Sequence, residues 1–141
     1  MAMNTGRVIG GGLLAGVIMN VVDFVGNGVW LGDRWLQQAT NLNPRLADPA
    51  MQTPSMIGWI VTDLLFGLLI VWSYAAMRPR FGPGPGTAVK ASLLIWGVSH
   101  IAYFSFVFLG LYGLNLVMMS AVVGLVAAVA GGVAGASLYQ E

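Results

Sequence analysis

Five polar side chains stand within otherwise apolar stretches of this 141-residue chain: Asn20, Asp23, Asn27, Asp63 and His100. An aspartate at the centre of a membrane-spanning helix costs roughly 2.5–3.5 kcal/mol on insertion scales. Such a side chain is therefore expected to face protein or water instead of lipid. Carboxyl, amide and imidazole groups in that setting suit the binding of a proton, a cation or a small solute, and these five residues are the candidate binding groups.

The first three candidates share one face of a predicted helix. At about 100° per residue, Asn20, Asp23 and Asn27 fall within a stripe about 80° wide. Asn20 and Asn27 stand one turn before and after Asp23, close enough to hydrogen-bond its carboxyl or a shared ligand. The same stripe holds Gly12, Gly16 and Trp30. Glycines there would allow another helix to come close, so the stripe is expected to face inward.

Depth in the membrane links the two aspartates. At about 1.5 Å per residue, Asp23 lies about 24 Å from Arg7 and Asp63 lies about 22 Å from Arg78. The two segments run in opposite directions, so both carboxyls are predicted at nearly the same level. His100 lies about 15 Å from Lys90, which places it somewhat nearer the middle of the membrane than the two aspartates. The spacing predicts a cluster of two carboxyls and one imidazole.

Two interpretations of the aspartates stay open. Two carboxyls close together in an apolar setting could exchange a proton near neutral pH or bind a cation. Alternatively, a neutral carboxyl, or one paired with histidine, would only tie helices together.

His100 also has two interpretations. A neutral imidazole binds metal through one nitrogen, so His100 could be an axial ligand of haem or chlorophyll. Alternatively, it is a hydrogen-bond partner of the two aspartates. A zinc site is less favoured because the chain has one histidine and metal-binding histidines usually come in groups. We therefore predict no metal and no cofactor, with haem or chlorophyll at His100 as the alternative.

Composition restricts the class of protein. Hydrophobic residues make up 57% of the chain and charged residues 8%, and the mean hydropathy is +0.81. A soluble domain carries about 25% charged residues, so this chain lacks the polar surface that water requires. The absence of cysteine excludes disulfides and thiolate sites. A net charge of +1 argues against nucleic acid as a partner. Hydrolase, metalloprotease and phosphate-loop motifs are absent, and no enzyme activity is expected.

Four apolar segments are long enough to cross a membrane, which takes about 20 residues. They cover about residues 8–31, 55–77, 87–109 and 114–138. The first segment is longer than the hydrophobic region of a signal peptide and contains Asp23, so we read it as a retained helix. The sequence therefore predicts an all-α, four-span transmembrane helical bundle that forms a single domain over residues 1–141.

Lysine and arginine predict the orientation of this bundle. One side receives Arg7, Arg78, Arg80 and Lys90, and the other receives Arg34 and Arg45. The bias places both termini in the cytoplasm, in a multi-pass protein of the cell inner membrane.

The first external loop contains "DRWLQQATNL", which is typical of a short amphipathic helix. Asp33 is its expected N-cap, and Asn43–Pro44 should end it. An interfacial helix on the outer leaflet is one interpretation, and a lid over a central cavity is the other.

The stretches "RPRFGPGPGTA" (78–88) and "GRVIGGGLLAGVIMN" (6–20) resemble those of a group of small, uncharacterised bacterial membrane proteins. In that group a four-helix chain carries an Arg-Pro-Arg-aromatic-Gly cytoplasmic loop. The resemblance implies a four-helix fold and brings no activity with it.

The last segment carries a smooth face of small residues: Gly124, Ala128, Gly131 and Gly135. Such a face is expected to pack against another helix. The pair Gly12 and Gly16 offers a matching surface within the chain. We predict that part of the face remains for a second copy.

These observations favour a proton-, cation- or small-solute-handling membrane protein that acts as an oligomer through Asp23 and Asp63. The alternative is a non-catalytic structural or accessory subunit of a larger membrane complex, with His100 holding a haem or chlorophyll. In both cases the partners are the lipid bilayer and other membrane chains.

Overall fold

A computed structural model describes residues 3–139, which are mainly helical. In chain order the elements are α1 (Thr5–Asp23), the π-helical segment η1 (Phe24–Trp30), α2 (Gly32–Leu42), the 3-10 turn η2 (Pro44–Ala47), α3 (Pro49–Phe81), α4 (Pro85–Phe108) and α5 (Leu114–Ser137). No β-strand occurs within residues 3–139. The predicted all-α fold is confirmed.

Four helices are long and apolar enough to span a membrane: Thr5–Trp30, Pro49–Phe81, Pro85–Phe108 and Leu114–Ser137. Large apolar side chains cover their outer surfaces; Ile101 is 77% exposed and Phe108 is 87% exposed. A continuous apolar surface of this kind is what lipid, and not water, would solvate. The predicted four-span bundle is therefore confirmed.

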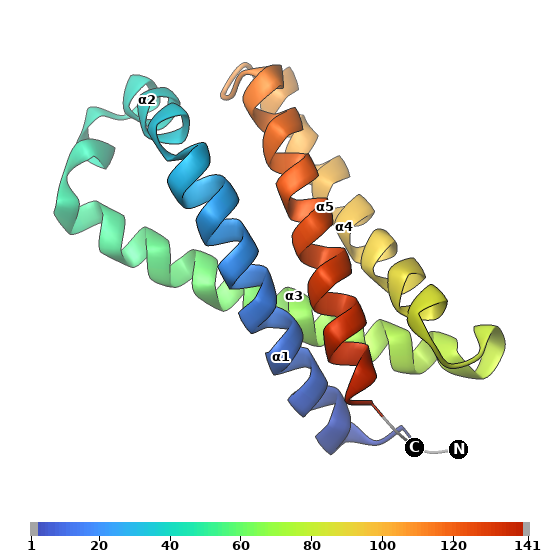
Figure 1. The fold of residues 1–141 in the computed structure, drawn as a ribbon. Coiled ribbons are helices and arrows are strands. Elements are labelled where there is room, and N and C mark those ends of the chain that lie inside the picture. Colours follow the sequence, from blue (N-terminus) through green and yellow to red (C-terminus); the bar gives the residue numbers. More distant parts are fainter. Residues whose placement is uncertain (1–2, 140–141) are drawn as a thin grey trace.

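The helices are arranged around α1 and α5, which lie side by side (Figure 1). α4 packs beside α5. α3 crosses behind the other helices and contacts α1, α4 and α5. The first half of α3 diverges from α4, whereas its second half approaches it. α2 lies at one end of the bundle, and Asn4 and Tyr139 meet at the opposite end through a 3.3 Å hydrogen bond from the Asn4 N–H. We call these the α2 end and the termini end.

α3 is longer than the predicted span of 55–77. It begins at Pro49, where proline suits the first turn of a helix, and the Asp48 side chain accepts a hydrogen bond from the Ala50 N–H at 2.9 Å. It also continues through Pro79 to Phe81. The predicted loop at 78–88 shrinks to residues 82–84, where two glycines have positive φ angles of 79° and 121°. These glycines make the reversal between α3 and α4.

Glycines on two neighbouring faces of α1 allow it to pack closely against two helices. Gly12 and Gly16 face α3: a Cβ on Gly12 would lie 2.7 Å from Leu68 Cα, and a Cβ on Gly16 would lie 2.6 Å from Leu64 Cα. Gly11 faces α5, and a Cβ there would lie 2.5 Å from the Gly135 carbonyl oxygen. The pair Gly12 and Gly16 thus meets α3, and not the small face of α5, which was the contact within the chain that the sequence offered as an alternative.

The small face of α5 is filled within the chain. A Cβ on Gly131 would lie 2.6 Å from the carbonyl oxygen of Ala15 in α1, and Ala128 is 3% exposed. Gly124 lies against His100 of α4. α5 packs between α1 and α4, so these residues make their contacts within the chain. That a second copy also meets this helix stays a prediction.

α2 confirms the helix predicted in the first loop, and it ends at Asn43 as expected. Asp33 is not its N-cap. The helix follows η1 directly through Leu31, so Asp33 lies inside the first turn. There its carboxylate is still favourable beside the free backbone N–H groups.

Candidate functional site

The π-helical segment η1 begins immediately after Asp23. Its wider turns shift the faces of the residues that follow, so Trp30, which was expected to face inward, is 61% exposed. Gly26 is buried within η1, and a Cβ there would overlap the side chain of Val123 in α5. This glycine lets the wide segment lie against α5. Asp23 thus stands at a change of helical geometry of the kind often found at functional sites.

Asp23 of α1 and Asp63 of α3 form a pair, which we call the acid pair. Their carboxyl groups lie within hydrogen-bonding reach of each other. Asp63 is 6% exposed and Asp23 is half-buried. An ionised carboxylate only accepts hydrogen bonds, so a bond between two carboxyls requires a proton on one of them. The arrangement therefore suits a pair that shares one proton.

Asn27 connects the acid pair to α2. Its Nδ2 donates to Asp23 Oδ1 at 3.0 Å, and its Oδ1 accepts from Trp35 Nε1 at 3.2 Å. The amide is therefore oriented by both partners, with its donor toward the carboxyl and its acceptor toward the indole. Sequence reasoning placed Trp35 only on the apolar face of α2. A half-buried indole N–H needs an acceptor, but Asn27 becomes its neighbour only in the folded structure.

Asn20 lies apart from this chain of hydrogen bonds. Its Nδ2 donates to the Gly16 carbonyl at 3.0 Å and to the Ile60 carbonyl of α3 at 3.2 Å. The side chain thus ties α1 to α3 through backbone oxygens. The structure does not bring it to the carboxyl of Asp23.

His100 makes its hydrogen bonds within its own helix, α4. Its Nδ1 lies 2.9 Å from the Trp96 carbonyl oxygen, which only accepts, so Nδ1 carries a proton. The imidazole also packs on the Trp96 ring at 5.0 Å between centroids. On its other edge, a Cβ on Gly124 would lie 3.1 Å from Nε2. His100 is therefore held between its own helix and α5.

This packing does not fit an axial ligand of a macrocycle. The Nε2 edge of His100 faces the backbone of Gly124, so α5 occupies the space where a porphyrin plane would stand. Among residues 3–139, no group of three or more His, Cys, Asp and Glu side chains is placed to hold a metal ion.

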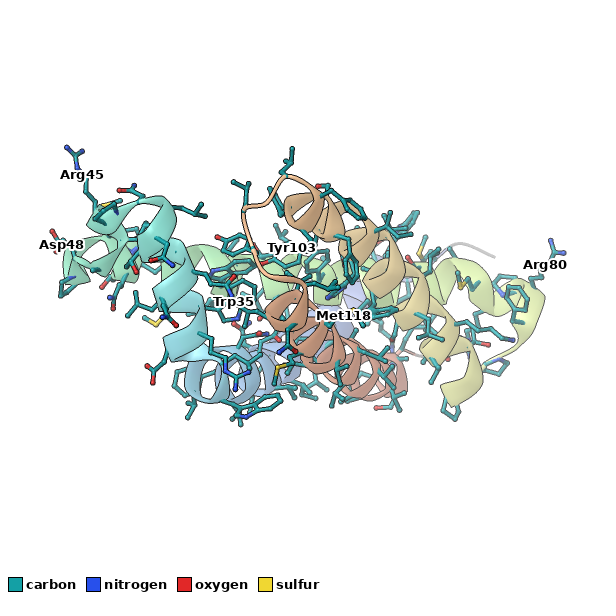
Figure 2. All side chains as sticks on the ribbon, turned by 90° about the horizontal axis from the view of Figure 1, so that it is seen from above. Trp35, Arg45, Asp48, Arg80, Tyr103 and Met118 are labelled. Atoms are coloured by element: carbon teal, nitrogen blue, oxygen red, sulfur yellow. The ribbon has the colours of Figure 1, made fainter. Side chains whose placement is uncertain are left out.

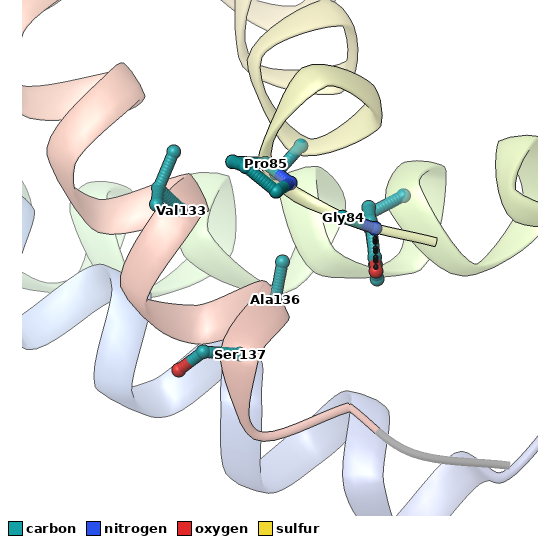
Figure 3. Close-up of a pocket in the computed structure, with 7 residues that line it drawn as sticks. Gly84, Pro85, Val133, Ala136 and Ser137 are labelled. Carbon is teal, nitrogen blue, oxygen red and sulfur yellow. Dashed lines mark hydrogen bonds between the residues drawn. The ribbon is translucent and has the colours of Figure 1, made fainter. Parts of the chain in front are cut away.

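Two recesses in the bundle lie away from the acid pair. One, of about 350 Å³, is lined by Val8, Leu68, Leu69 and Trp72. The other, of about 270 Å³, lies between the start of α4 and the end of α5 (Figure 3). There the Gly84 N–H donates to the Tyr74 hydroxyl at 3.2 Å. No charged side chain lines either recess, and neither borders His100.

Aromatic rings gather on the side of the acid pair toward the α2 end. Trp35 lies 6.2 Å from Tyr103 of α4 and 5.3 Å from Tyr112 of the α4–α5 turn, measured between ring centroids. Phe106 packs on Tyr103 at 5.5 Å. Viewed from this end, Trp35 and Tyr103 point toward each other across the gap between α2 and α4 (Figure 2). We call these four residues the aromatic cluster.

No protein-family model, curated protein or solved structure matches this chain. The resemblance to small bacterial four-helix membrane proteins stays a prediction.

Proposed function

We propose that this protein handles protons in a membrane, with the acid pair as the group that takes up and releases them. The observation that carries the proposal is the contact between the carboxyls of Asp23 and Asp63 inside an apolar bundle. Ionisable residues that face one another within a membrane are typical of proton relays and ion paths. A purely structural polar contact could be made by two amides, without the cost of inserting two aspartates.

The ligands near the acid pair favour a proton over a larger cargo. A metal cation needs several oxygen ligands, about six or more for Ca²⁺ and Mg²⁺. Beside the acid pair, the amide oxygen of Asn27 already accepts a hydrogen bond from Trp35. The two recesses described above lie away from the pair and have no charged side chain in their lining. A proton needs no cavity of its own.

Movement across the whole membrane requires more than the arrangement in one chain. Between the acid pair and the termini end, α1 and α3 touch through Gly12, Gly16 and Gly67, which leaves no room for water between their backbones. Release at that end needs a rearrangement of this contact or a path shared with further copies. We therefore keep the oligomer, and an inner-membrane location with cytoplasmic termini, as part of the proposal.

Proton flux into sealed vesicles tests the proposal. Purified protein would be reconstituted into liposomes that contain a pH-sensitive dye, and a proton gradient would be applied. We expect flux above that of empty liposomes, and its loss in Asp23→Asn and in Asp63→Asn. Asp33→Asn is the matched control, because Asp33 is an exposed aspartate on α2. Wild-type flux equal to that of empty liposomes, or full flux in both acid-pair variants, would show that the proposal is wrong.

A further inference from the structure

α2 is attached to the bundle by side chains more than by a buried face. None of its residues is fully buried. Gln38 Oε1 accepts from the Gly113 N–H in the α4–α5 turn at 2.8 Å, and Arg34 Nη1 lies 3.2 Å from Met119 Sδ of α5. Few bonds thus hold α2 across the end of the bundle, which is typical of a segment that opens locally at low cost.

Trp35 is the residue of α2 that reaches toward the acid pair. Its indole N–H donates to Asn27, which in turn donates to Asp23. Its ring packs with Tyr103 and Tyr112 in the aromatic cluster. Trp35 therefore belongs both to the chain of hydrogen bonds that ends at Asp23 and to the aromatic cluster.

The connections of α2 allow it to move as a unit. Leu31, before its first residue, is 0% exposed and packs in a cluster with Leu116 and Val123 of α5. Asn43, after its last residue, has an extended backbone with φ −148° and ψ 105°. A fixed anchor at one end and an extended link at the other are the element-terminal positions at which hinge motion occurs.

We propose that α2 is the gate of the acid pair on the α2 end of the bundle, and that Trp35 is the side chain that closes it. In the closed state, Trp35 holds Asn27 against Asp23 and covers the acid pair. When α2 lifts from the α4–α5 turn, this hydrogen bond breaks and water reaches the carboxyls. The purpose of this gate rests on the proposed function. The barrier that α2 and Trp35 present to water and solutes can nevertheless be measured without any transport.

Thiol accessibility measures the barrier directly. The chain has no cysteine, so a single Val22→Cys variant provides one probe. Val22 precedes Asp23, is half-buried and packs with the same apolar cluster as Trp35. The reagent is a charged, membrane-impermeant methanethiosulfonate applied from the α2 side. We expect slow modification, and a rate about ten-fold or more higher after Trp35→Ala or Trp35→Leu.

Two further variants make this measurement specific to the gate. Leu36→Ala removes an exposed apolar side chain from α2 without touching the aromatic cluster, so the rate should stay unchanged. Trp35→Phe keeps a ring but loses the N–H, so its rate should rise less than that of Trp35→Leu. Circular dichroism confirms that each variant is folded, and Trp35→Leu retains apolar bulk if Trp35→Ala does not fold. A modification rate that neither Trp35→Ala nor Trp35→Leu raises overturns the gate.

Locking α2 to the α4–α5 turn tests its movement. Gln38 Cδ lies 3.9 Å from the position of a Cβ on Gly113, so Gln38→Cys with Gly113→Cys can be joined by a short, reducible bifunctional thiol linker. We expect the linked protein to lose proton flux and to regain it after reduction, with each single-cysteine variant unaffected by the reagent. Unchanged flux in the linked protein overturns the gate. If the wild type carries no protons, the proposed function fails, and the accessibility of Val22→Cys alone decides whether α2 is a gate.

Discussion

The backbones of Gly16 in α1 and Asp63 in α3 approach so closely that a Cβ on Gly16 would lie 3.0 Å from the Asp63 carbonyl oxygen. This approach fixes how far apart α1 and α3 can be at the level of the acid pair. Asp23 stands about two turns farther along α1, where its carboxyl meets that of Asp63. The glycine contact and the acid pair are therefore parts of one arrangement: the first sets the separation that the second requires.

Infrared spectroscopy should detect the shared proton of the acid pair. Because a hydrogen bond between two carboxyls needs one protonated partner, we expect a carbonyl-stretch band of a protonated carboxylic acid at neutral pH. Asp63→Asn and Asp23→Asn should each remove this band, since the remaining carboxyl loses its carboxyl partner and has an amide in its place. Asp33→Asn, on exposed α2, should leave the band unchanged. A wild-type spectrum without the band would mean that the two carboxyls do not share a proton.

A methyl group at Gly67 should separate α1 from α3. Its Cβ would overlap the backbone of Gly12 and Gly16, and neither backbone can move without moving its helix. Overpacking of this kind costs about 1–3 kcal/mol, so Gly67→Ala should lower the thermal unfolding temperature in detergent.

The control for this variant is Gly97→Ala in α4, where nothing lies within 4 Å of the added Cβ. It should be neutral or slightly stabilising, because alanine is the better helix former. Gly67→Ala should also weaken the infrared band of the acid pair. An unfolding temperature equal to that of Gly97→Ala would show that the α1–α3 contact is looser than described.

The fold and the level of the acid pair could be predicted from the sequence, because both depend on simple periodic quantities. Apolar runs of membrane length give the four spans, and a rise of about 1.5 Å per residue gives matched depths for Asp23 and Asp63. Depth alone does not give the rotation of each helix. The meeting of these two carboxyls also required their faces to turn toward each other.

Features that depend on the rotation of a helix, or on which helices pack against each other, were not predictable in this way. The π-helical turns after Asp23 rotate Trp30 outward, and no local residue pattern predicts these turns. Two adjacent glycine faces of α1 gave no indication of which helix each would meet. Trp35 was assigned to a surface helix, because its acceptor Asn27 becomes a neighbour only when α2 folds back over η1.

Reporter fusions should place both termini in the cytoplasm. Asn4 and Tyr139 lie together at the termini end, where Arg7, Arg78 and Lys90 also belong by their positions in α1, α3 and α4. Positive residues in short loops favour the cytoplasmic side. A fusion after Glu141 should report from the cytoplasm and a fusion within α2 at Thr40 from the opposite side. The reverse pair of results would invert the orientation and would put the proposed gate on the cytoplasmic face.

Gly131→Leu should destabilise the single chain instead of changing its assembly. A Cβ on Gly131 already lies 2.6 Å from the Ala15 carbonyl oxygen and 2.9 Å from Met19 Cγ, so a leucine side chain has no space between α1 and α5. We expect a fall in unfolding temperature, with a cost of about 1–3 kcal/mol or more. Val126→Leu is the matched control, because Val126 is 54% exposed on the same helix and leucine has a favourable free energy of insertion into the membrane. Size-exclusion chromatography with light scattering would report the assembly. A change in particle size without a change in unfolding temperature would mean that Gly131 packs between chains, and the intrachain contact of α1 with α5 would have to be abandoned.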